Sequence, residues 1–349
     1  MGNSYDTAIK RIAVLTSGGD APGMNAAIRA VVRSGIYFGL EVVGIERGYN
    51  GMLSDEDEVR IMALRDVSDI ISAGGTILFS ARSRAYNSPE GVQKAAEFCA
   101  RHRIGGVVVI GGDGSFRGAH DLSQAGVPCV GVPGTIDNDI ASSYYTIGYD
   151  TALNTAMRMI DNIRDTTESH DRCSVVEVMG ARSGYLALNT GLACGASAIL
   201  VPEHCPDGRV DIDQIINRIR INKAQGKRHF IVVVAEGVGI PVGETLSTMQ
   251  HKRHFADVLA ETIESKTGIE SRSSILGHVQ RGGSPTVRDR VVATEMGCHA
   301  VNLMRQEAGN RVVVMDREGI ITDLDITAAL SMKKPFPSHL LKIGEIVSI

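Results

Sequence analysis

Short apolar runs recur along the chain, and amphipathic stretches separate them. Arg11–Thr16, Val107–Ile110 and Cys129–Val132 are three such runs, and a turn rich in glycine or acidic residues follows each of them. A continuous apolar run of this length is typical of a strand buried on both faces. Strands that alternate with helices are joined by right-handed crossovers into parallel sheets. The pattern therefore predicts an α/β fold whose ligands bind at the carboxyl ends of the strands, where the turns lie.

Further elements are expected on the same grounds. The other strand candidates are Glu41–Ile45, Ser174–Val178, Ala198–Val201, Phe230–Ala235, Ser274–Leu276 and Val312–Met315. Apolar spacings of three and four predict helices from Met24 to Val32 and over Thr151–Arg164, Ile212–Ala224 and Phe255–Lys266. This number of strands suits two three-layer α/β/α Rossmann-like domains with mainly parallel sheets and a cleft between them. A break is expected near Tyr145–Asp150, and Val238–Gln250 is interpreted as a loop or an insertion.

Composition argues against several classes of protein. The 349 residues are 43% hydrophobic, enough for a large core, and the formal net charge of −4 disfavours a nucleic-acid binder held by bulk charge. No apolar run approaches the ~20 residues that a membrane span needs. The six cysteines form no Cys-x-x-Cys pair, which favours reduced core thiols in a cytoplasmic protein over disulfides or zinc. We therefore expect no nucleic-acid partner and no membrane association.

The turn Gly111–Ser115 has the composition of a polyphosphate site. Its glycines let backbone N–H groups approach phosphate oxygens, and Asp113 offers the carboxylate that Mg²⁺ favours alongside phosphates. The turn Ser17–Asp20, taken alone, is explained equally well as a tight connection between a strand and a helix. The turn Pro133–Asp139 adds two acids, which point different ways if the backbone is strand-like. An isolated acid pair is usually a solvated turn, but acidic turns at neighbouring strand ends favour phosphoryl transfer.

A basic turn follows the predicted strand Ser274–Leu276. Gly277–Pro285 places His278 and Arg281 three residues apart among glycines. Arginine offers a two-pronged donor to phosphate, and a glycine-rich turn at a strand end favours anion binding. A lone histidine is more often structural than functional, so both interpretations of His278 stay open.

Five segments together resemble the bacterial ATP-dependent 6-phosphofructokinases, the phosphofructokinase A family. They run in the family's order and span nearly the whole chain: Leu15–Asn25, Gly111–Ser115, Pro133–Asp139, Val176–Gly180 and Leu276–Pro285. The resemblance implies phosphorylation of fructose 6-phosphate at its 1-hydroxyl by ATP, the committed step of glycolysis, with Mg²⁺ as cofactor. It also implies a cytoplasmic homotetramer whose sites are shared between subunits. The implied domains are a larger ATP-binding domain, residues 1–148 plus 280–330, and a smaller fructose-6-phosphate-binding domain, residues 149–279 plus 331–349.

The resemblance implies a role for each matching residue. Asp137 is the general base for the sugar hydroxyl, Asp113 carries Mg²⁺, and Asp139 supports the acid cluster. Thr135 and Arg82 act on the transferring phosphoryl group. The implied ATP site contains Gly19, Tyr49, Arg82, Ser83, Gly112, Asp113, Gly114 and Ser115. The implied sugar-phosphate site contains Thr135, Asp137, Met179, Gly180, Ala181, Glu236, His278 and Arg281, with Arg172 and Arg272 reaching it from a neighbouring subunit.

Single residues bear on the phosphate donor. Pyrophosphate-using members of the superfamily typically have Asp where this chain has Gly114 and Lys where it has Gly134. A carboxylate at position 114 would crowd and repel the α-phosphate, whereas glycine leaves room for it. We therefore predict ATP as the donor, with a pyrophosphate-dependent enzyme as the nearest alternative. The presence of Asp137, Asp113 and Arg281 disfavours a silent nucleotide sensor, and the lack of a Gly-x-Gly-x-x-Gly turn disfavours a dehydrogenase.

The resemblance is less complete at the family's effector site, which binds ADP or phosphoenolpyruvate between subunits. Four residues match basic positions of that site: Arg29, Arg33, Arg164 and Lys227. However, Ser197 replaces an acid there and Gln225 replaces a lysine. The two arginines of the first helix are explained nearly as well as a solvated helix face. A further departure is Ala181, because many bacterial members have arginine directly after Met-Gly, whereas here Arg182 follows one residue later.

Overall fold

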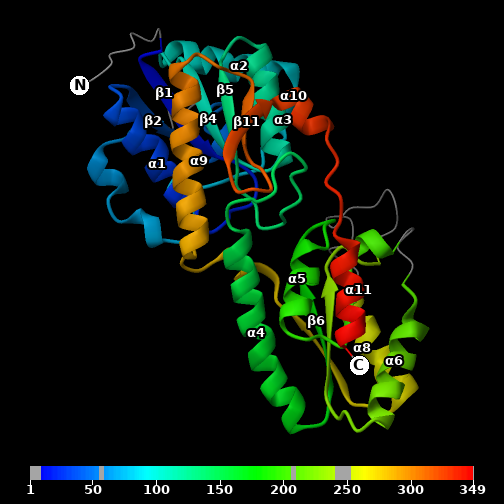
Figure 1. Cartoon of the computed structure of the whole chain (residues 1–349). Helices are drawn as coiled ribbons and strands as arrows, with labels where there is room; N and C mark the ends of the chain where they lie inside the picture. Colours follow the sequence, from blue (N-terminus) through cyan, green and yellow to red (C-terminus); the bar gives the residue numbers. More distant parts are fainter. Residues whose placement is uncertain (1–8, 55–58, 206–209, 240–252, 349) are drawn as a thin grey trace. The chain divides into compact units, whose positions relative to one another are not determined.

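A computed structural model describes residues 9–54, 59–205, 210–239 and 253–348 of the chain (Figure 1). They form two compact units. Unit 1 comprises Met1–Ile136, Ile140–Thr151 and Arg281–Lys334, and unit 2 comprises Asp137–Asp139, Ala152–Gln280 and Pro335–Ile349. Most of the predicted loop or insertion at Val238–Gln250 lies outside the described residues.

Unit 1 is built on a seven-stranded sheet with the order β11-β10-β5-β4-β1-β2-β3. Its strands are β1 (Arg11–Thr16), β2 (Glu41–Ile45), β3 (Val59–Ile61), β4 (Gly106–Gly111), β5 (Cys129–Pro133), β10 (Arg311–Met315) and β11 (Ile321–Asp325). The five inner strands are parallel, and β3 and β11 pair antiparallel at the two edges. Every residue of β4 and β5 is buried, which explains why these strands are continuous apolar runs rather than alternating ones.

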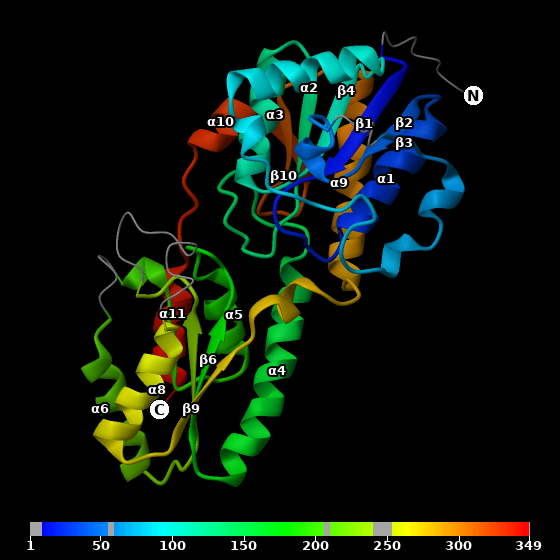
Figure 2. The same cartoon turned by 180° about the vertical axis from the view of Figure 1, so that it is seen from behind.

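Helices cover both faces of this sheet. On one face lie α1 (Met24–Tyr37) and α9 (Val287–Arg305), and on the other lie α2 (Pro89–Arg101), α3 (Asp113–Gln124) and α10 (Ile326–Ser331) (Figure 1 and Figure 2). The pair α1 and α9 approaches closely at Gly297, where a Cβ atom would come within 2.7 Å of the Ala30 methyl group. Short 3-10 turns connect the elements: η1 (Gly48–Asn50), η2 (Leu64–Val67), η3 (Ile70–Ser72) and η4 (Ala85–Asn87).

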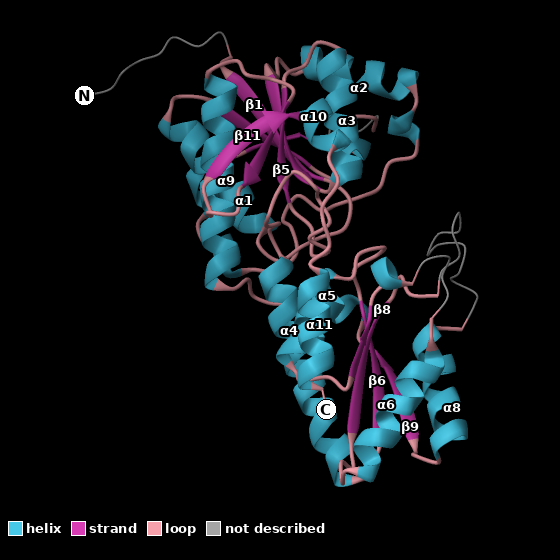
Figure 3. Ribbon diagram, turned by 45° about the vertical axis from the view of Figure 1, so that its right-hand side comes forward, coloured by secondary structure: helices cyan, strands magenta, loops and turns pink. Residues whose placement is uncertain are grey.

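Unit 2 is built on a four-stranded parallel sheet with the order β7-β8-β6-β9. Its strands are β6 (Cys173–Val178), β7 (Ala198–Leu200), β8 (Phe230–Ala235) and β9 (Ser271–Ile275). On one face lie α5 (Tyr185–Ala193) and α11 (Ser338–Val347), and on the other lie α6 (Ile212–Ala224) and α8 (Phe255–Thr267) (Figure 3). The helix α4 (Tyr149–Ser169) begins in unit 1 and belongs to unit 2 from Ala152 onward. Two 3-10 turns complete the unit, η5 (Pro202–His204) and η7 (Gly277–Arg281).

The predicted fold class is confirmed, since both units are three-layer α/β structures with mainly parallel sheets. One strand is shifted: β9 begins at Ser271, three residues before the predicted start at Ser274. It is an edge strand of mixed burial, so its first residues are serines and an arginine rather than an apolar run. The edge strands β3 and β11 were not predicted for the same reason. Within the described residues, no helix is both long enough and apolar enough to cross a bilayer.

Candidate functional site

Three of the predicted turns meet at one edge of the unit 1 sheet. The strand β4 lies between β1 and β5, and the register pairs Thr16 with Ile110 and Gly111 with Pro133. The carboxyl ends of the three parallel strands are therefore side by side. The Ser17 N–H group donates to the Ile110 carbonyl at 3.0 Å, so the first turn starts hydrogen-bonded to the strand that carries the second.

Ser115 joins the first two turns. Its hydroxyl is buried and donates to the Ser17 carbonyl at 3.1 Å. A Cβ atom on Gly111 would lie 2.5 Å from both of these oxygens, so close packing requires glycine there. The Gly134 N–H group donates to the Gly111 carbonyl at 3.0 Å and links the third turn to the second. The three turns therefore form one connected group of backbone and hydroxyl groups.

The second turn passes directly into α3, which starts at Asp113. Gly112 is the N-cap of this 12-residue helix, and its carbonyl accepts the N–H groups of Ser115 at 2.9 Å and of Phe116 at 3.1 Å. A helix N-terminus favours anions, because the positive end of the helix dipole attracts negative charge. Gly114 is exposed, and a Cβ atom there would meet no atom within 4 Å. Asp113 is half-buried, so a carboxylate lies beside an open, electropositive helix end.

Two stacked tyrosines support this helix end. The rings of Tyr49 and Tyr86 lie 4.0 Å apart, and their hydroxyls donate to the carbonyls of Ser115 and Gly118, both at 2.7 Å. Burial raises the pKa of both phenols well above the usual range, so they remain protonated donors. Tyr49 was predicted for the ATP site, and it is 4% exposed and holds the backbone of Ser115. Tyr86 was not predicted, because its contact depends on a distant helix rather than on a local motif.

A loop that carries two more predicted residues packs against the first turn. The Ser80 hydroxyl donates to the Gly18 carbonyl at 2.6 Å, and the Gly18 N–H group donates to the Ala81 carbonyl at 3.5 Å. Arg82, which is exposed, and Ser83, which is half-buried, follow directly. The structure therefore brings both residues next to the turn that contains Gly19.

The third turn brings Thr135 against the second. The Thr135 Cβ atom lies 4.0 Å from the position that a Cβ atom on Gly112 would take. A Cβ atom on Gly134 would instead lie 3.0 Å from the Ile110 side chain and 3.3 Å from that of Met24. A longer side chain at position 134 would thus press into the core. Glycine at this position has a packing explanation in addition to the donor argument.

Arg281 also belongs to unit 1. Its Nη1 atom donates to the Asp20 carbonyl at 3.0 Å. Its guanidinium group covers Gly19, since a Cβ atom there would lie 2.6 Å from Nη1. The family resemblance implies that Gly19 belongs to the ATP site and Arg281 to the sugar-phosphate site, and the structure places the two residues in contact. His278 is exposed on the same turn, η7, and falls in unit 2.

In unit 2, predicted sugar-binding residues gather at the carboxyl ends of β6 and β8. The Glu236 Oε1 atom accepts the N–H groups of Gly180 at 3.2 Å and of Ala181 at 2.7 Å. Gly180 has φ 139° and Ala181 has φ 52°, so both residues adopt conformations that L side chains rarely take. Glu236 therefore fixes an unusual backbone path next to the buried side chain of Met179. Such outliers concentrate at ligand sites.

Asp137 lies with this group. The Ser183 hydroxyl donates to the Asp137 carbonyl at 3.0 Å, and the Ser183 N–H group donates to the Gly180 carbonyl at 2.7 Å. The turn is not strand-like as expected, because Asn138 is buried with φ 49°. Asparagine tolerates this left-handed conformation better than most residues. Asp137 is half-buried and Asp139 is exposed. The two acids therefore lie in different environments, but not because they alternate between the two faces of a strand.

A buried acid that was not predicted lies close to Glu236. Glu177 of β6 has a side chain only 6% exposed, and its Oε1 atom is 2.8 Å from Nδ1 of His254. Burial raises the pKa of Glu177, the hydrogen bond from His254 opposes the rise, and the nearby charge of Glu236 adds to it. The contact joins residues 77 positions apart, so no local pattern indicates it.

Arg172 and Arg272 lie elsewhere in unit 2. Arg172 immediately precedes β6 and Arg272 is near the start of β9, and both pair with Glu270, at 2.9 and 2.6 Å. Six residues of extended chain, about 20 Å, separate Arg172 from Val178. The structure therefore does not bring these arginines to the Glu236 group of their own chain.

The predicted effector residues form two pairs. Arg29 and Arg33 are one turn apart on α1, and the Nε atom of each is buried without a hydrogen-bond partner within the described residues. Both side chains are half-buried, so they do not form a fully solvated face. In unit 2, burial and the nearby charge of Arg164 lower the pKa of Lys227. The positive charges of Lys227 and Arg164 repel each other, so an anion bound near both side chains would be stabilised.

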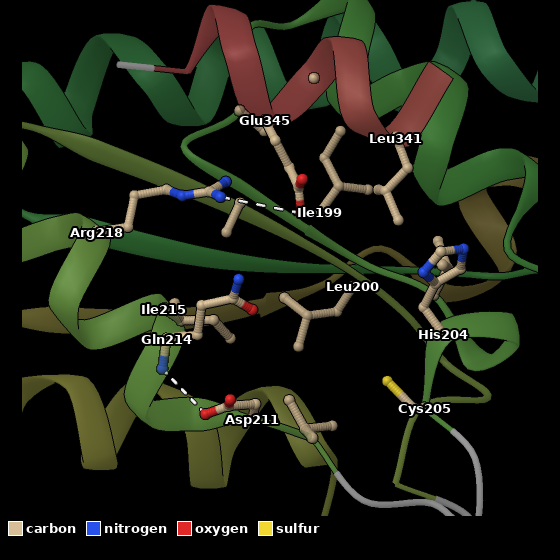
Figure 4. Close-up of a pocket in the computed structure, with 15 residues that line it drawn as sticks. Ile199, Leu200, His204, Cys205, Asp211, Gln214, Ile215, Arg218, Leu341 and Glu345 are labelled. Carbon is tan, nitrogen blue, oxygen red and sulfur yellow. Dashed lines mark hydrogen bonds and ion pairs between the residues drawn. The ribbon is translucent and has the colours of Figure 1, made fainter. Parts of the chain in front are cut away.

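A separate pocket of about 180 Å³ opens in unit 2 (Figure 4). Its wall comes mainly from β7, α6 and α11: apolar Ile199, Leu200, Ile215 and Leu341, and polar His204, Asp211, Gln214, Arg218 and Glu345. No predicted catalytic, substrate-binding or effector residue lines it.

No group of three or more histidine, cysteine, aspartate or glutamate side chains suited to a metal occurs in the parts of the chain that the structure covers. Mg²⁺ does not need such a group, because one or two carboxylates suffice when substrate phosphates supply the other ligands. Asp113, in the first turn of α3, is the carboxylate predicted for this role.

Comparison with known proteins identifies the family. The chain matches the phosphofructokinase family over residues 11–304. It is 49% identical over 341 residues to an ATP-dependent 6-phosphofructokinase of Alkaliphilus metalliredigens, covering 98% of this chain and 100% of that protein. It is also 49% identical over 340 residues to the enzyme of the same name from Clostridium tetani, covering 97% of this chain and 100% of the relative.

Solved structures agree with this relationship. Phosphofructokinase of Saccharomyces cerevisiae matches with a TM-score of 0.82 and 33% identity, over 97% of this chain and 48% of the yeast chain, so this chain spans about half the length of that one. A pyrophosphate-dependent phosphofructokinase from Marinobacter aquaeolei shares the fold, with a TM-score of 0.80 at 21% identity over 95% of this chain and 86% of that chain. The chain therefore belongs to the phosphofructokinase family.

Proposed function

We propose that this protein transfers the γ-phosphoryl group of ATP to the 1-hydroxyl of fructose 6-phosphate, which yields fructose 1,6-bisphosphate and ADP. The observation that carries the proposal is the meeting of three turns at the carboxyl ends of β1, β4 and β5. A helix N-terminus, an exposed glycine and a half-buried carboxylate suit a magnesium-bound triphosphate. The names of the curated relatives, ATP-dependent 6-phosphofructokinase, support the same donor and acceptor.

The residues of unit 1 act on the donor in this proposal. Asp113 would hold Mg²⁺ together with phosphate oxygens, and the bound metal would neutralise negative charge on the phosphates. The N–H groups at Gly112 and Gly114 bind phosphate oxygens. Arg82 and Thr135 act on the γ-phosphoryl group, where fixed positive charge and positioning supply most of the catalysis. The open space beside Gly114 leaves room for an α-phosphate and so favours ATP over pyrophosphate.

The acceptor is bound by the second set of residues. Asp137 accepts the proton of the 1-hydroxyl while the hydroxyl oxygen attacks the γ-phosphorus, and ADP leaves with the electron pair of the broken P–O bond. A positioned base of this kind contributes roughly 10²–10⁴-fold to the rate. Glu236, with the backbone it fixes at Gly180, orients the sugar. His278 and Arg281 bind the 6-phosphate.

We further propose a homotetramer in which subunits share sites. Arg172 and Arg272 lie at the amino ends of their strands, away from the Glu236 group of the same chain. Placing these two arginines at the 6-phosphate of a neighbouring subunit gives them the role that the family resemblance implies. A site completed by a neighbour also gives a physical route to cooperativity. As a step of glycolysis, the proposed reaction takes place in the cytoplasm.

The test is a steady-state assay of ADP release. With Mg-ATP and fructose 6-phosphate, ADP release should require both substrates and should saturate with each. Fructose without the 6-phosphate should be a far poorer acceptor, because the phosphate-binding residues are then left without a partner. Pyrophosphate should replace ATP poorly. Absence of ADP release with both substrates present would refute the proposal.

A further inference from the structure

The guanidinium group of Arg281 lies on Gly19. Nη1 donates to the carbonyl of Asp20 at 3.0 Å, which fixes the end of a long side chain against the first turn. A Cβ atom on Gly19 would lie 2.6 Å from Nη1, 2.9 Å from Cζ and 3.1 Å from Nη2. All three of its nearest neighbours would thus be atoms of one guanidinium group.

The backbone does not explain why residue 19 is glycine. Gly18 has φ 89°, a conformation that favours glycine, whereas Gly19 lies outside the positive-φ region. An alanine would therefore fit the backbone at position 19. The space that its methyl group needs is the space that the guanidinium group occupies.

We infer that Gly19 is a positioning residue for the sugar phosphate, because its missing side chain provides the place where Arg281 rests. The inference deepens the proposed function and rests on it. A free arginine loses rotamer freedom when it binds phosphate, and a side chain already held loses less. The contact also joins the turn proposed for ATP to the residue proposed for the 6-phosphate. A change in the donor turn should therefore alter affinity for the acceptor even when no nucleotide is present.

The test is Gly19→Ala, with the dissociation constant for fructose 6-phosphate measured by calorimetry in the absence of any nucleotide. Omitting nucleotide separates the contact with Arg281 from any contact of Gly19 with ATP. The new methyl group meets only the far end of a flexible side chain among its three nearest neighbours, so the fold should persist. We expect the dissociation constant to rise about tenfold, corresponding to ~1.4 kcal/mol.

A matched control lies in the second glycine turn. Gly114→Ala also adds one methyl group, but at a position with no atom within 4 Å. Affinity for fructose 6-phosphate without nucleotide should stay unchanged in this variant. A double-mutant cycle supplies the second measurement: once Arg281→Ala has removed the guanidinium group, adding Gly19→Ala should cause no further loss of affinity.

The outcomes separate the inference from the proposed function. Unchanged affinity in Gly19→Ala, or equal losses from Gly19→Ala with and without Arg281, would overturn the inference alone. Unchanged affinity in Arg281→Ala would instead overturn the proposed role of Arg281 at the 6-phosphate. A loss in Gly19→Ala that disappears in the Arg281→Ala background supports both.

Discussion

Asp289 is a buried carboxylate whose replacement should measurably destabilise unit 1. It lies in the first turn of α9 and is 0% exposed. One oxygen accepts the N–H group of Gly148 at 2.7 Å and the hydroxyl of Tyr145 at 2.6 Å. The other carboxylate oxygen accepts the N–H group of Thr151 at 2.9 Å and also the hydroxyl group of Thr151. Asp289 thus joins the start of α9 to the start of α4.

Asp289→Asn keeps the shape of the side chain but turns one acceptor into a donor. The two hydroxyls can rotate, whereas the two N–H groups cannot. Because each N–H group uses a different oxygen, one of them faces an NH₂ group whichever way the amide is turned. An unsatisfied buried N–H group costs about 1–3 kcal/mol. Burial raises the pKa of Asp289, so loss of the charge offsets part of this cost, and we expect a net loss of ~2 kcal/mol.

The assay is thermal unfolding followed by circular dichroism at pH 7. For a unit of about 200 residues, a loss of ~2 kcal/mol lowers Tm by roughly 4–8 °C. Thr151→Ser is the matched control, because it keeps both hydrogen bonds to Asp289 and loses only a buried methyl group, which should cost about 0.8 kcal/mol, well below the loss expected for Asp289→Asn. If Asp289→Asn melts at the same temperature as the parent, the carboxylate does not hold both N–H groups and the reasoning is refuted.

Three further predictions follow from the same geometry. Gly114→Asp should lower kcat/KM for ATP by ~10²-fold and should lower kcat/KM for pyrophosphate by less. The reason is that a carboxylate ~5 Å from the α-phosphate costs ~3 kcal/mol at an effective dielectric constant of ~20. Equal kcat/KM for ATP in variant and parent would contradict this reasoning. Burial raises the pKa of Glu177 in the folded protein above its ordinary value of ~4.3. The protonated side chain therefore contributes to the free energy of unfolding fully below pH ~4.3, and this contribution is lost as pH rises through the raised pKa. The stability of the parent relative to Glu177→Gln, measured by urea unfolding, should therefore fall as pH rises above about 4, and a difference that rises with pH would contradict this assignment. Lys227→Ala should weaken the effect of ADP or phosphoenolpyruvate on half-saturation with fructose 6-phosphate by about tenfold, because it removes a charge-assisted contact. A parent enzyme that responds to neither anion would contradict the predicted effector role of Lys227.

The fold was predictable where burial leaves a local signal. The strands β4 and β5 are buried at every residue, so their apolar runs and the turns that follow them were visible in the sequence. The edge strands were harder to predict, because each has a neighbouring strand on one side only and its residues are less buried. β11 mixes apolar, polar and acidic residues, and β9 starts with polar ones.

The candidate site was predictable as a set of residues but not as a set of contacts. The residue types of Gly111–Ser115 favour a phosphate site, and this assignment stays a prediction. The contact of Arg281 with Asp20 joins positions 261 apart, and that of Ser183 with Asp137 joins positions 46 apart. Such contacts depend on the packing of the whole unit, so no local pattern specifies them. The left-handed conformation of Asn138 also escaped prediction, because asparagine adopts several backbone conformations.

The central claim is that this chain phosphorylates fructose 6-phosphate from ATP with Asp137 as the base. The most direct measurement is ADP release from Mg-ATP and fructose 6-phosphate by the parent and by Asp137→Asn. The account predicts turnover by the parent, and a kcat lower by roughly 10²–10⁴-fold in the variant with nearly the same affinity for the sugar phosphate. A parent that releases no ADP, or a variant that turns over at the parent's rate, would contradict it.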